Sequence, residues 1–288
     1  MNPIEFLNCL LCNSNLLRPL AGYSKHHLVQ CGNCSFVFSS RIPNEKELVD
    51  FYGQYPIAES LSAITKKRYD EWLAEFEPYR KTNNILDVGC GDGYFLQSAR
   101  DKGWNVYGTE FTTRQVENCK AKGISMHQGV LDVANYEPEF FDVIVSIEVI
   151  EHINNPNTEL QKFNTLCRKG GAVYVTTPNF NALSRNYLKG TWNILAYPEH
   201  LSYYTKKTLC FAFQRNGFKV ENFQSTGISI KRILQSTVGN NITESTADET
   251  FRKNAEEKFL FRFAKTTVNT LLTSTNKGDT LKGLFIKA

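Results

Sequence analysis

Apolar residues occur in two alternating patterns from about residue 85 to the carboxyl terminus. Short apolar runs, of which 140–149 is nearly continuous, alternate with stretches whose apolar positions lie three or four residues apart. The runs are typical of strands in a parallel sheet, and the wider spacing predicts amphipathic helices, so the chain is predicted to form a doubly wound α/β fold. Strands are expected at 85–88, 105–111, 124–129, 140–149, 172–177, 218–226 and 282–288. Helices are expected at 61–79, after residue 94, and at 112–123, 157–168, 205–216 and 255–272.

The first of these strands ends in a loop with glycines at alternate positions. Asp87 precedes Gly89, Gly91 and Gly93, and a helical pattern follows directly. Glycine is needed where the backbone turns sharply or approaches a ligand, and a loop at the carboxyl end of a parallel strand forms a nucleotide-type pocket. A dinucleotide-binding loop would need its third glycine at Tyr94, which disfavours a dehydrogenase. A purely structural turn is the other alternative.

Further motifs connect this loop to a known family. Glu110 ends the second strand, where a carboxylate can accept both hydroxyls of a ribose. With 146–152 (SIEVIEH) and 278–281 (GDTL), these features resemble the class I S-adenosylmethionine-dependent methyltransferases over roughly residues 60–288. The core is similar to the ubiquinone-type O-methyltransferases. The resemblance implies a seven-stranded, mostly parallel sheet whose last strand is antiparallel, and S-adenosylmethionine as cofactor.

The resemblance also implies which residues hold the cofactor. Phe111 would lie against the adenine ring. Leu131 or Asp132 would accept from the adenine amine, because Val130 occupies the position where many relatives carry an acid. The complete expected cofactor set is Asp87, Gly89, Gly91, Gly93, Glu110, Phe111, Leu131, Asp132 and Ser146.

Two segments supply candidate catalytic groups. A hydroxyl acceptor loses its proton as it is methylated, and histidine is a suitable base near neutral pH. His152 follows the fourth strand together with Glu148, and His200 lies close to Tyr203 in a segment that would close over the acceptor. We slightly favour His152 as the base and assign Tyr203 to orienting the substrate. A structural role for either histidine is the alternative.

The segment 148–152 (EVIEH) also bears on metal binding. It resembles the E-x-x-E-H sequence of the ubiquinone-type enzymes, some of which bind a divalent cation through the two acids and the histidine. The resemblance implies that Glu148, Glu151 and His152 can hold Mg²⁺, but we favour a site without this ion.

Two pairs of cysteines lie near the amino terminus. Cys9 and Cys12 form one C-x₂-C pair, Cys31 and Cys34 form the other, and 18 residues separate the pairs. This spacing is typical of a zinc site with four thiolate ligands. The other four cysteines are scattered, and we find neither a signal peptide nor an apolar run that could span a membrane. We therefore expect a cytoplasmic protein whose cysteines bind zinc rather than form disulfides.

Length and charge set the remaining expectations. A chain of 288 residues is long enough for two domains. The net charge is only +4 and no run of lysine and arginine exceeds three residues, so a nucleic-acid groove is not indicated. We expect a zinc ribbon at 1–42, a helical linker at 43–82 and a methyltransferase domain at 83–288. A helical insertion at 233–276 would pack on the sheet, cover the substrate or form a dimer contact.

The order of these parts suggests an acceptor. A zinc ribbon, the segment 41–52 (RIPNEKELVDFY), a helix and then the α/β fold resemble bacterial methyltransferases of surface-polysaccharide and deoxysugar synthesis. The resemblance implies a sugar or sugar-nucleotide hydroxyl as the acceptor. Two alternatives stay open. One is methylation of ribosomal RNA, because one family of guanine methyltransferases also has an amino-terminal zinc module. The other is a non-catalytic module that holds the cofactor and docks a protein partner.

Overall fold

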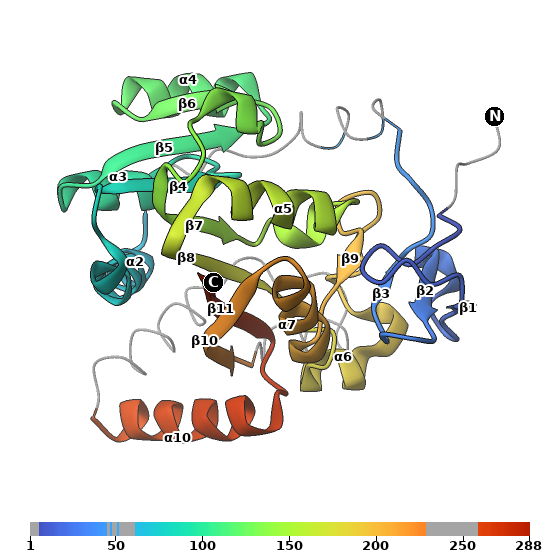
Figure 1. Cartoon of the computed structure of the whole chain (residues 1–288). Coiled ribbons are helices and arrows are strands. Elements are labelled where there is room, and N and C mark those ends of the chain that lie inside the picture. The colour runs from blue at the N-terminus through green and yellow to red at the C-terminus, as the bar shows by residue number, and fades with distance from the viewer. Residues whose placement is uncertain (1–5, 45–46, 48–50, 52–60, 229–258) are drawn as a thin grey trace.

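The larger part of the protein is built on a seven-stranded sheet (Figure 1). The computed structural model describes residues 6–44, 47, 51, 61–228 and 259–288. The strand order is β10-β11-β8-β7-β4-β5-β6, with β11 antiparallel to both of its neighbours and the others parallel. The strands are β4 (Asn84–Val88), β5 (Asn105–Glu110), β6 (Ser125–Gln128), β7 (Phe141–Ile147), β8 (Cys167–Pro178), β10 (Phe218–Thr226) and β11 (Thr280–Lys287).

Helices cover both faces of this sheet. Apolar residues of α2 and α3 pack on Ile85 and Val143, and those of α5 and α7 pack on the opposite face against Leu86 and Ile144. The α-helices are α2 (Ala63–Phe76), α3 (Tyr94–Asp101), α4 (Thr113–Ala121), α5 (Pro156–Leu166), α6 (Leu183–Leu188), α7 (Lys206–Arg215) and α10 (Phe259–Thr275). The short 3₁₀ helices are η1 (Ser24–His26), η2 (Glu77–Tyr79), η3 (Val133–Asn135), η4 (Ile150–His152) and η5 (Lys189–Thr191).

The predicted doubly wound sheet is confirmed, with small differences in element length. The strand predicted at 172–177 begins at Cys167, because β8 continues through Gly171. A Cβ at Gly171 would lie 2.8 Å from the carbonyl oxygen of Asp142, so only glycine allows the strand to pass so close to β7. Most of residues 45–60 of the helical linker expected at 43–82, and much of the insertion expected at 233–276, lie outside the described residues.

A second, four-stranded sheet lies at the amino-terminal end of the chain (Figure 1). It consists of β1 (Leu17–Pro19), β2 (Leu28–Cys31), β3 (Val37–Ser39) and β9 (Ser202–Tyr203), in that order. β9 comes from the middle of the chain and pairs antiparallel with β3. The amino-terminal module is therefore joined by backbone hydrogen bonds to the segment that follows His200, a connection that the sequence did not predict.

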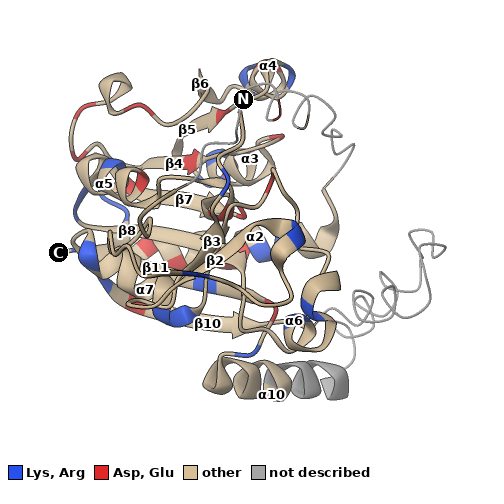
Figure 2. Ribbon diagram, turned by 90° about the vertical axis from the view of Figure 1, so that its right-hand side faces the viewer, with Lys and Arg blue, Asp and Glu red and all other residues tan. Residues whose placement is uncertain are grey.

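The charges of the molecule are distributed without strong separation. Figure 2 shows lysine and arginine interspersed with aspartate and glutamate over the described elements in this view. This distribution agrees with the mild net charge of +4. In the part of the chain that the structure describes, no helix is both long enough and apolar enough to cross a bilayer.

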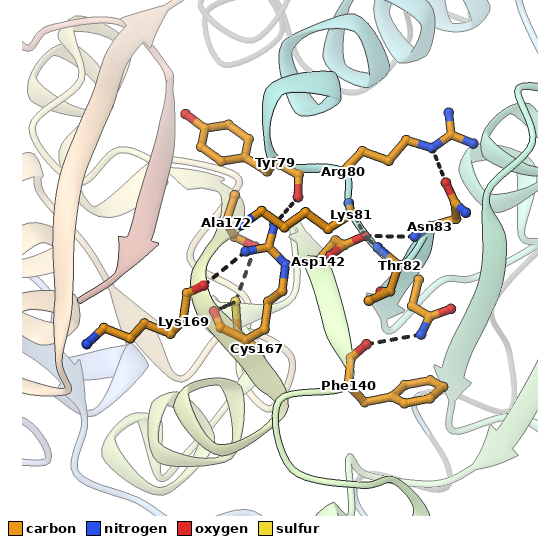
Figure 3. A network of polar contacts seen from close by, with 12 residues as sticks. Tyr79, Arg80, Lys81, Thr82, Asn83, Phe140, Asp142, Cys167, Lys169 and Ala172 are labelled. Carbon is orange, nitrogen blue, oxygen red and sulfur yellow. Dashed lines mark hydrogen bonds and ion pairs between the residues drawn. The ribbon is translucent and has the colours of Figure 1, made fainter.

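One buried carboxylate fixes the amino ends of the central strands (Figure 3). Asp142 of β7 is fully buried, and its Oδ2 accepts hydrogen bonds from the backbone amides of Lys81, Thr82 and Asn83 at 2.8, 2.6 and 2.8 Å. Its Oδ1 accepts from Arg168 Nε at 2.6 Å. Burial raises the pKa of Asp142, but Arg168 and the amides outweigh it and hold this pKa below its usual range. The network connects the segment between α2 and β4 to β7 and β8.

Candidate functional site

The glycine loop lies at the carboxyl end of β4, as the sequence predicts. Gly91 has a φ of +53°, and a Cβ built on it would meet no other atom within 4 Å. Gly93 has a φ of +72°, and its Cβ would lie 2.7 Å from both Cys119 Sγ and Ile124 Cδ1. Gly93 therefore allows α3 to start close to α4, whereas Gly91 leaves open space above the loop where a ligand can approach the backbone.

Asp87 lies beneath this loop with an unsatisfied oxygen. Its side chain is buried, and its Oδ1 has no hydrogen-bond partner among the described residues. Burial, and then the neighbouring Cys119 and Glu110, raise the pKa of Asp87 well above its ordinary value. An unpaired buried carboxylate oxygen is costly, and a cationic or N–H group of a ligand would offset that cost.

Glu110 joins the glycine loop to the end of β5. Its Oε2 accepts from the backbone amide of Gly91 at 3.0 Å, and its Oε1 accepts from the amides of Phe111 and Thr112 at 2.7 and 3.1 Å. Oε1 also lies 3.5 Å from Thr112 Oγ1, whereas Oε2 accepts a single bond among the described residues and therefore keeps capacity for a ribose hydroxyl. The adjacent Phe111 ring is 44% exposed and offers an apolar surface to a ligand.

The other expected cofactor residues, Leu131, Asp132 and Ser146, have contacts elsewhere in the structure. Leu131 is buried in the core, and its carbonyl accepts from Lys162 Nζ at 2.7 Å. Asp132 caps η3 by accepting from the amide of Ala134 at 3.0 Å. Ser146 is fully buried, and strand alternation puts it on the opposite face of the sheet from Asp87. The structure thus brings Asp87, the glycine loop and Glu110 together but keeps the side chains of Leu131 and Ser146 in the interior.

The two candidate histidines lie against each other. The rings of His152 and His200 are 4.8 Å apart between centroids, at an angle of 72°. His200 Nδ1 lies 2.6 Å from the carbonyl oxygen of Ile194. Because a carbonyl only accepts, Nδ1 of a neutral His200 carries the proton and its Nε2 has a lone pair. The sequence analysis treated His152 and His200 as alternative bases, and in the structure their rings contact each other.

His152 is held in its neutral form. Burial, and then the adjacent His200, lower the pKa of His152 to about 4, while hydrogen bonds with the backbone of Glu148 and Glu199 oppose the shift. A neutral imidazole can accept a proton, but a base with so low a pKa binds that proton weakly.

The two acids beside His152 accept hydrogen bonds from different threonines of β8. The carboxylate of Glu151 accepts from Thr177 Oγ1 at 3.0 Å, and burial followed by the charge of Glu148 raises its pKa well above the usual value. Glu148 instead accepts from Thr176 Oγ1 at 2.7 Å. Ligand atoms of Glu151, His152 and His200 lie within 4.8 Å of one another. His200 takes the place of Glu148 in this grouping: Glu148 is held by Thr176, whereas Glu151 is held by the next residue of β8, Thr177.

Tyr203 supports the loop that carries His200. Its hydroxyl donates to the carbonyl oxygen of His200 at 3.1 Å, and its ring packs on Phe180 with centroids 5.5 Å apart. Only 4% of the Tyr203 side chain is exposed. These contacts assign the hydroxyl to holding the loop, whereas the sequence assigned it to the substrate. The sequence analysis did not identify Thr176 and Thr177. Their position as a pair of threonines at the end of a predicted strand is the signal that could have indicated them.

The four amino-terminal cysteines form a single cluster. Their sulfur atoms all lie within 4.8 Å of one another, with Cys9 Sγ and Cys34 Sγ 3.5 Å apart and Cys12 Sγ and Cys31 Sγ also 3.5 Å apart. Four thiolates around a tetrahedral zinc ion are about 3.8 Å apart, because Zn–S bonds are about 2.3 Å long. All four are free thiols, so the cluster fits the donor set of a structural zinc ion.

Comparisons with known proteins agree with this geometry. Residues 61–222 match the model of a family described as a methyltransferase domain. The chain is similar to the ubiquinone biosynthesis O-methyltransferase of Bordetella avium, with 26% identity over 43% of this chain and 54% of that protein. The corresponding protein of Cupriavidus pinatubonensis is 31% identical over 34% of this chain and 42% of that protein. The chain spans about half the length of the curated relatives it matches.

Solved structures share the fold. A SAM-dependent methyltransferase from Archaeoglobus fulgidus superposes with a TM-score of 0.53 and 17% identity, covering 78% of this chain and 93% of that one. A sarcosine dimethylglycine methyltransferase assigned in Galdieria sulphuraria gives a TM-score of 0.51 with 13% identity, covering 78% of this chain and 84% of that one.

Proposed function

Because the chain belongs to the methyltransferase domain family, which its residues 61–222 match, we propose that it transfers the methyl group of S-adenosylmethionine to an oxygen of a small-molecule acceptor. The observation that carries this proposal is the unpaired, buried Oδ1 of Asp87 beneath the open space at Gly91. A cationic ligand that reaches this oxygen satisfies it, and Glu110 would accept hydrogen bonds from the same ligand's hydroxyl groups. The similarity to ubiquinone biosynthesis O-methyltransferases supports oxygen as the accepting atom.

The residues that hold the cofactor differ from those that act on the acceptor. Asp87, the backbone at Gly91 and Glu110 would bind S-adenosylmethionine, whose sulfonium supplies an activated methyl group. The protein then has to align the acceptor and remove the proton of its hydroxyl. His152 and His200 are the groups suited to that proton transfer, because His152 is neutral and Nε2 of a neutral His200 has a lone pair. Glu151 and Tyr203 hold the segments on which these histidines lie.

The favoured acceptor is a sugar or sugar-nucleotide hydroxyl. Its support is the resemblance of the order of parts to bacterial methyltransferases of surface-polysaccharide synthesis. Glu148, held by Thr176 and four residues before His152, adds a carboxylate that suits a hydroxyl-rich acceptor.

The cysteine cluster is proposed to bind one structural zinc ion. Cys9, Cys12, Cys31 and Cys34 complete a tetrahedral site without water, which suits a structural rather than a catalytic ion. Leu11, Phe36 and Phe38 of this module are buried in the main core, so the metal would chiefly hold the two cysteine pairs together.

Ligand binding tests the cofactor assignment directly. Isothermal titration of the whole protein with S-adenosylhomocysteine should give a one-to-one complex, and Asp87→Asn should weaken S-adenosylmethionine at least tenfold because an amide does not attract a cation. Asp101→Asn, an exposed change at the end of α3, is the matched control and should leave binding unchanged. Failure of the unmodified protein to bind either compound would refute the proposal.

A further inference from the structure

Two cysteine thiols meet at the glycine loop. Cys90 lies between Gly89 and Gly91 in the loop after β4, and Cys119 lies on α4. The two thiols hydrogen-bond to each other, and their sulfur atoms lie 3.9 and 3.3 Å from the same carbonyl oxygen, that of Gly91. Both are free thiols. The sequence analysis treated Cys90 and Cys119 as scattered cysteines, whereas the fold brings them into contact.

Two glycines leave the space that these sulfur atoms occupy. A Cβ at Gly93 would lie 2.7 Å from Cys119 Sγ, and a Cβ at Gly108 of β5 would lie 2.9 Å from Cys90 Sγ. A larger residue at either position would therefore displace a thiol. Met126 of β6 contacts the pair from another side, with its Sδ 3.8 Å from Cys90 Sγ. The packing of α4, β5 and β6 thus keeps the two sulfur atoms next to each other.

The Cys119 thiol is one of two groups that hold the backbone at Gly91. Its S–H donates to the carbonyl oxygen of Gly91 at 3.3 Å, and the amide of Gly91 donates to Glu110 Oε2 at 3.0 Å. Gly91 faces the open space in which a ligand can approach the backbone. A change in the bonding of the Cys119 sulfur therefore acts directly on the loop that is proposed to bind the cofactor.

The two thiols differ in acidity and in exposure. The hydrogen bond from Cys90 and the charge of Lys122 lower the pKa of the Cys119 thiol, although its burial opposes them. A lowered pKa increases the share of thiolate, which is the form that attacks a peroxide. Cys119 is buried, whereas Cys90 is partly exposed and gives a small oxidant access to the pair. A cysteine that forms a thiolate next to a second cysteine is the arrangement of a reversible disulfide.

We propose that Cys90 and Cys119 form a reversible disulfide when the protein meets a peroxide, and that this disulfide weakens the binding of S-adenosylmethionine. The inference rests on the proposed methyltransferase function. It adds to that function a redox modification site in the cofactor loop and a means of controlling the affinity for the cofactor.

The chemistry needs one molecule of hydrogen peroxide. The sulfur of one cysteine attacks a peroxide oxygen, so an S–O bond forms, the O–O bond breaks, and the leaving hydroxide takes up the thiol proton as water. The second sulfur then attacks the sulfenic acid, so the S–S bond forms, the S–O bond breaks and a second water leaves. The two cysteines are oxidised and the peroxide is reduced, and a dithiol reverses the disulfide by thiol–disulfide exchange.

The disulfide changes the loop in two ways. An S–S bond is about 2.05 Å long, which is shorter than a hydrogen-bonded contact between thiols, so it draws Cys90 toward α4. The oxidised sulfur of Cys119 has no proton, so the carbonyl oxygen of Gly91 loses its donor. Only Glu110 then holds the backbone at Gly91, through its amide. Because the loop is shifted and less firmly held, the affinity for the cofactor falls.

Peptide mapping and calorimetry on the whole protein test the proposal. Trypsin cleaves after lysine and arginine, so Cys90 falls in the peptide 82–100 and Cys119 in the peptide 115–120, each with a single cysteine. Hydrogen peroxide should join these two peptides by a disulfide and weaken S-adenosylhomocysteine about tenfold or more, and dithiothreitol should reverse both effects. Absence of the joined peptide at peroxide concentrations that oxidise other cysteines of the chain would overturn the proposal. Unchanged affinity in protein that carries the disulfide would also overturn it.

Matched variants assign the effect to this pair. Cys90→Ser and Cys119→Ser should each bind S-adenosylhomocysteine equally well before and after peroxide treatment, each variant being compared with its own reduced form. Either variant suffices if the other does not fold. Cys210→Ser on α7, a half-buried thiol outside the pair, should keep the full loss of affinity. A loss of affinity that persists in Cys90→Ser and Cys119→Ser would assign the effect to other cysteines and refute the inference.

This inference and the proposed function fail in different ways. Reduced protein that binds no S-adenosylhomocysteine refutes the proposed function, while peptide mapping still reports whether the disulfide forms. Reduced protein that binds S-adenosylhomocysteine with an affinity that peroxide does not change leaves the methyltransferase function standing and removes the redox site.

Discussion

Glu110 has two roles at the residue scale, because it fixes the glycine loop and faces the space above it. Its three hydrogen bonds to backbone amides order Gly91 and the end of β5 before any ligand binds. Glu110→Ala should therefore weaken S-adenosylmethionine binding by about 1.5–3 kcal/mol, the range for a hydrogen bond to a charged group. Glu110→Gln, which keeps one acceptor oxygen, should lose less. Calorimetry that finds equal affinities for all three proteins would remove Glu110 from the site.

The histidine pair leads to a prediction about turnover and pH. Replacement of the true base by alanine should lower turnover about 10²–10⁴-fold and leave S-adenosylhomocysteine affinity intact. Because the pKa of His152 is about 4, the rate should not rise between pH 6 and 8 through this group. A pH–rate profile and both variants, His152→Ala and His200→Ala, test this. Near-normal turnover in both variants would exclude histidine base catalysis.

The lowered pKa of His152 also makes the free energy of folding depend on pH. The folded-state pKa of His152, about 4, lies below the unfolded value of about 6.5, so the unfolded chain binds the proton more tightly. This contribution to stability is complete above pH 6.5 and is lost as the pH falls toward 4. Denaturant titrations of the unmodified protein and His152→Ala should therefore differ in how steeply stability falls over that window.

At the scale of elements, the junction between α2 and β4 depends on Asp142. Asp142→Ala would leave three backbone amides and the Arg168 guanidinium, only 11% exposed as a side chain, without their acceptor. Removing one partner of a buried ion pair costs about 3–5 kcal/mol. The free energy of unfolding from denaturant titration should fall by that amount. Glu139→Gln, which breaks the exposed pair with Lys287, is the control and should cost less than about 1 kcal/mol.

Elements with a clear hydrophobic pattern could be predicted from the sequence, and elements without one could not. β7 was predicted from its nearly continuous apolar run and β5 from a short stretch that ends in an acid, and Asp87 and Glu110 follow from their place at the ends of predicted strands. β9 has only two residues, too few for a pattern, and its partner β3 lies far away in the sequence. The contact between His152 and His200 joins two segments that lie far apart in the sequence, so it could not be predicted from either segment alone.

At the scale of the whole molecule, the cysteine module and the histidine site form one connected structure. Asn157 of α5 donates to the carbonyl oxygens of Leu10 and Leu11, next to Cys9 and Cys12, at 2.8 and 3.0 Å. The amide of Ser39 donates to the carbonyl oxygen of Leu201 at 2.8 Å. The amide of Leu201 in turn donates to the carbonyl oxygen of Glu151 at 2.8 Å. A path of three residues therefore leads from the amino-terminal sheet to the segment of His152.

The last prediction follows from this path. Purified protein should contain one zinc ion per chain, and Cys31→Ser should remove the ion and loosen the small sheet next to it, because the metal joins the two cysteine pairs. β9 then loses its partner β3, so the loop of His200 loses one of the contacts that position it, while the bonds of Leu201 to Glu151 and of Ser202 to Ile153 remain. Turnover should fall because the histidine pair is less firmly positioned, while S-adenosylhomocysteine still binds, since Glu110 holds the glycine loop to the end of β5 rather than to the amino-terminal sheet. Cys210→Ser, a half-buried thiol outside the cluster, is the control and should keep both zinc and activity.

Elemental analysis that finds no metal in protein kept reduced and free of chelators would contradict the zinc site. Full turnover in zinc-free Cys31→Ser would show that the acceptor loop is ordered without the module.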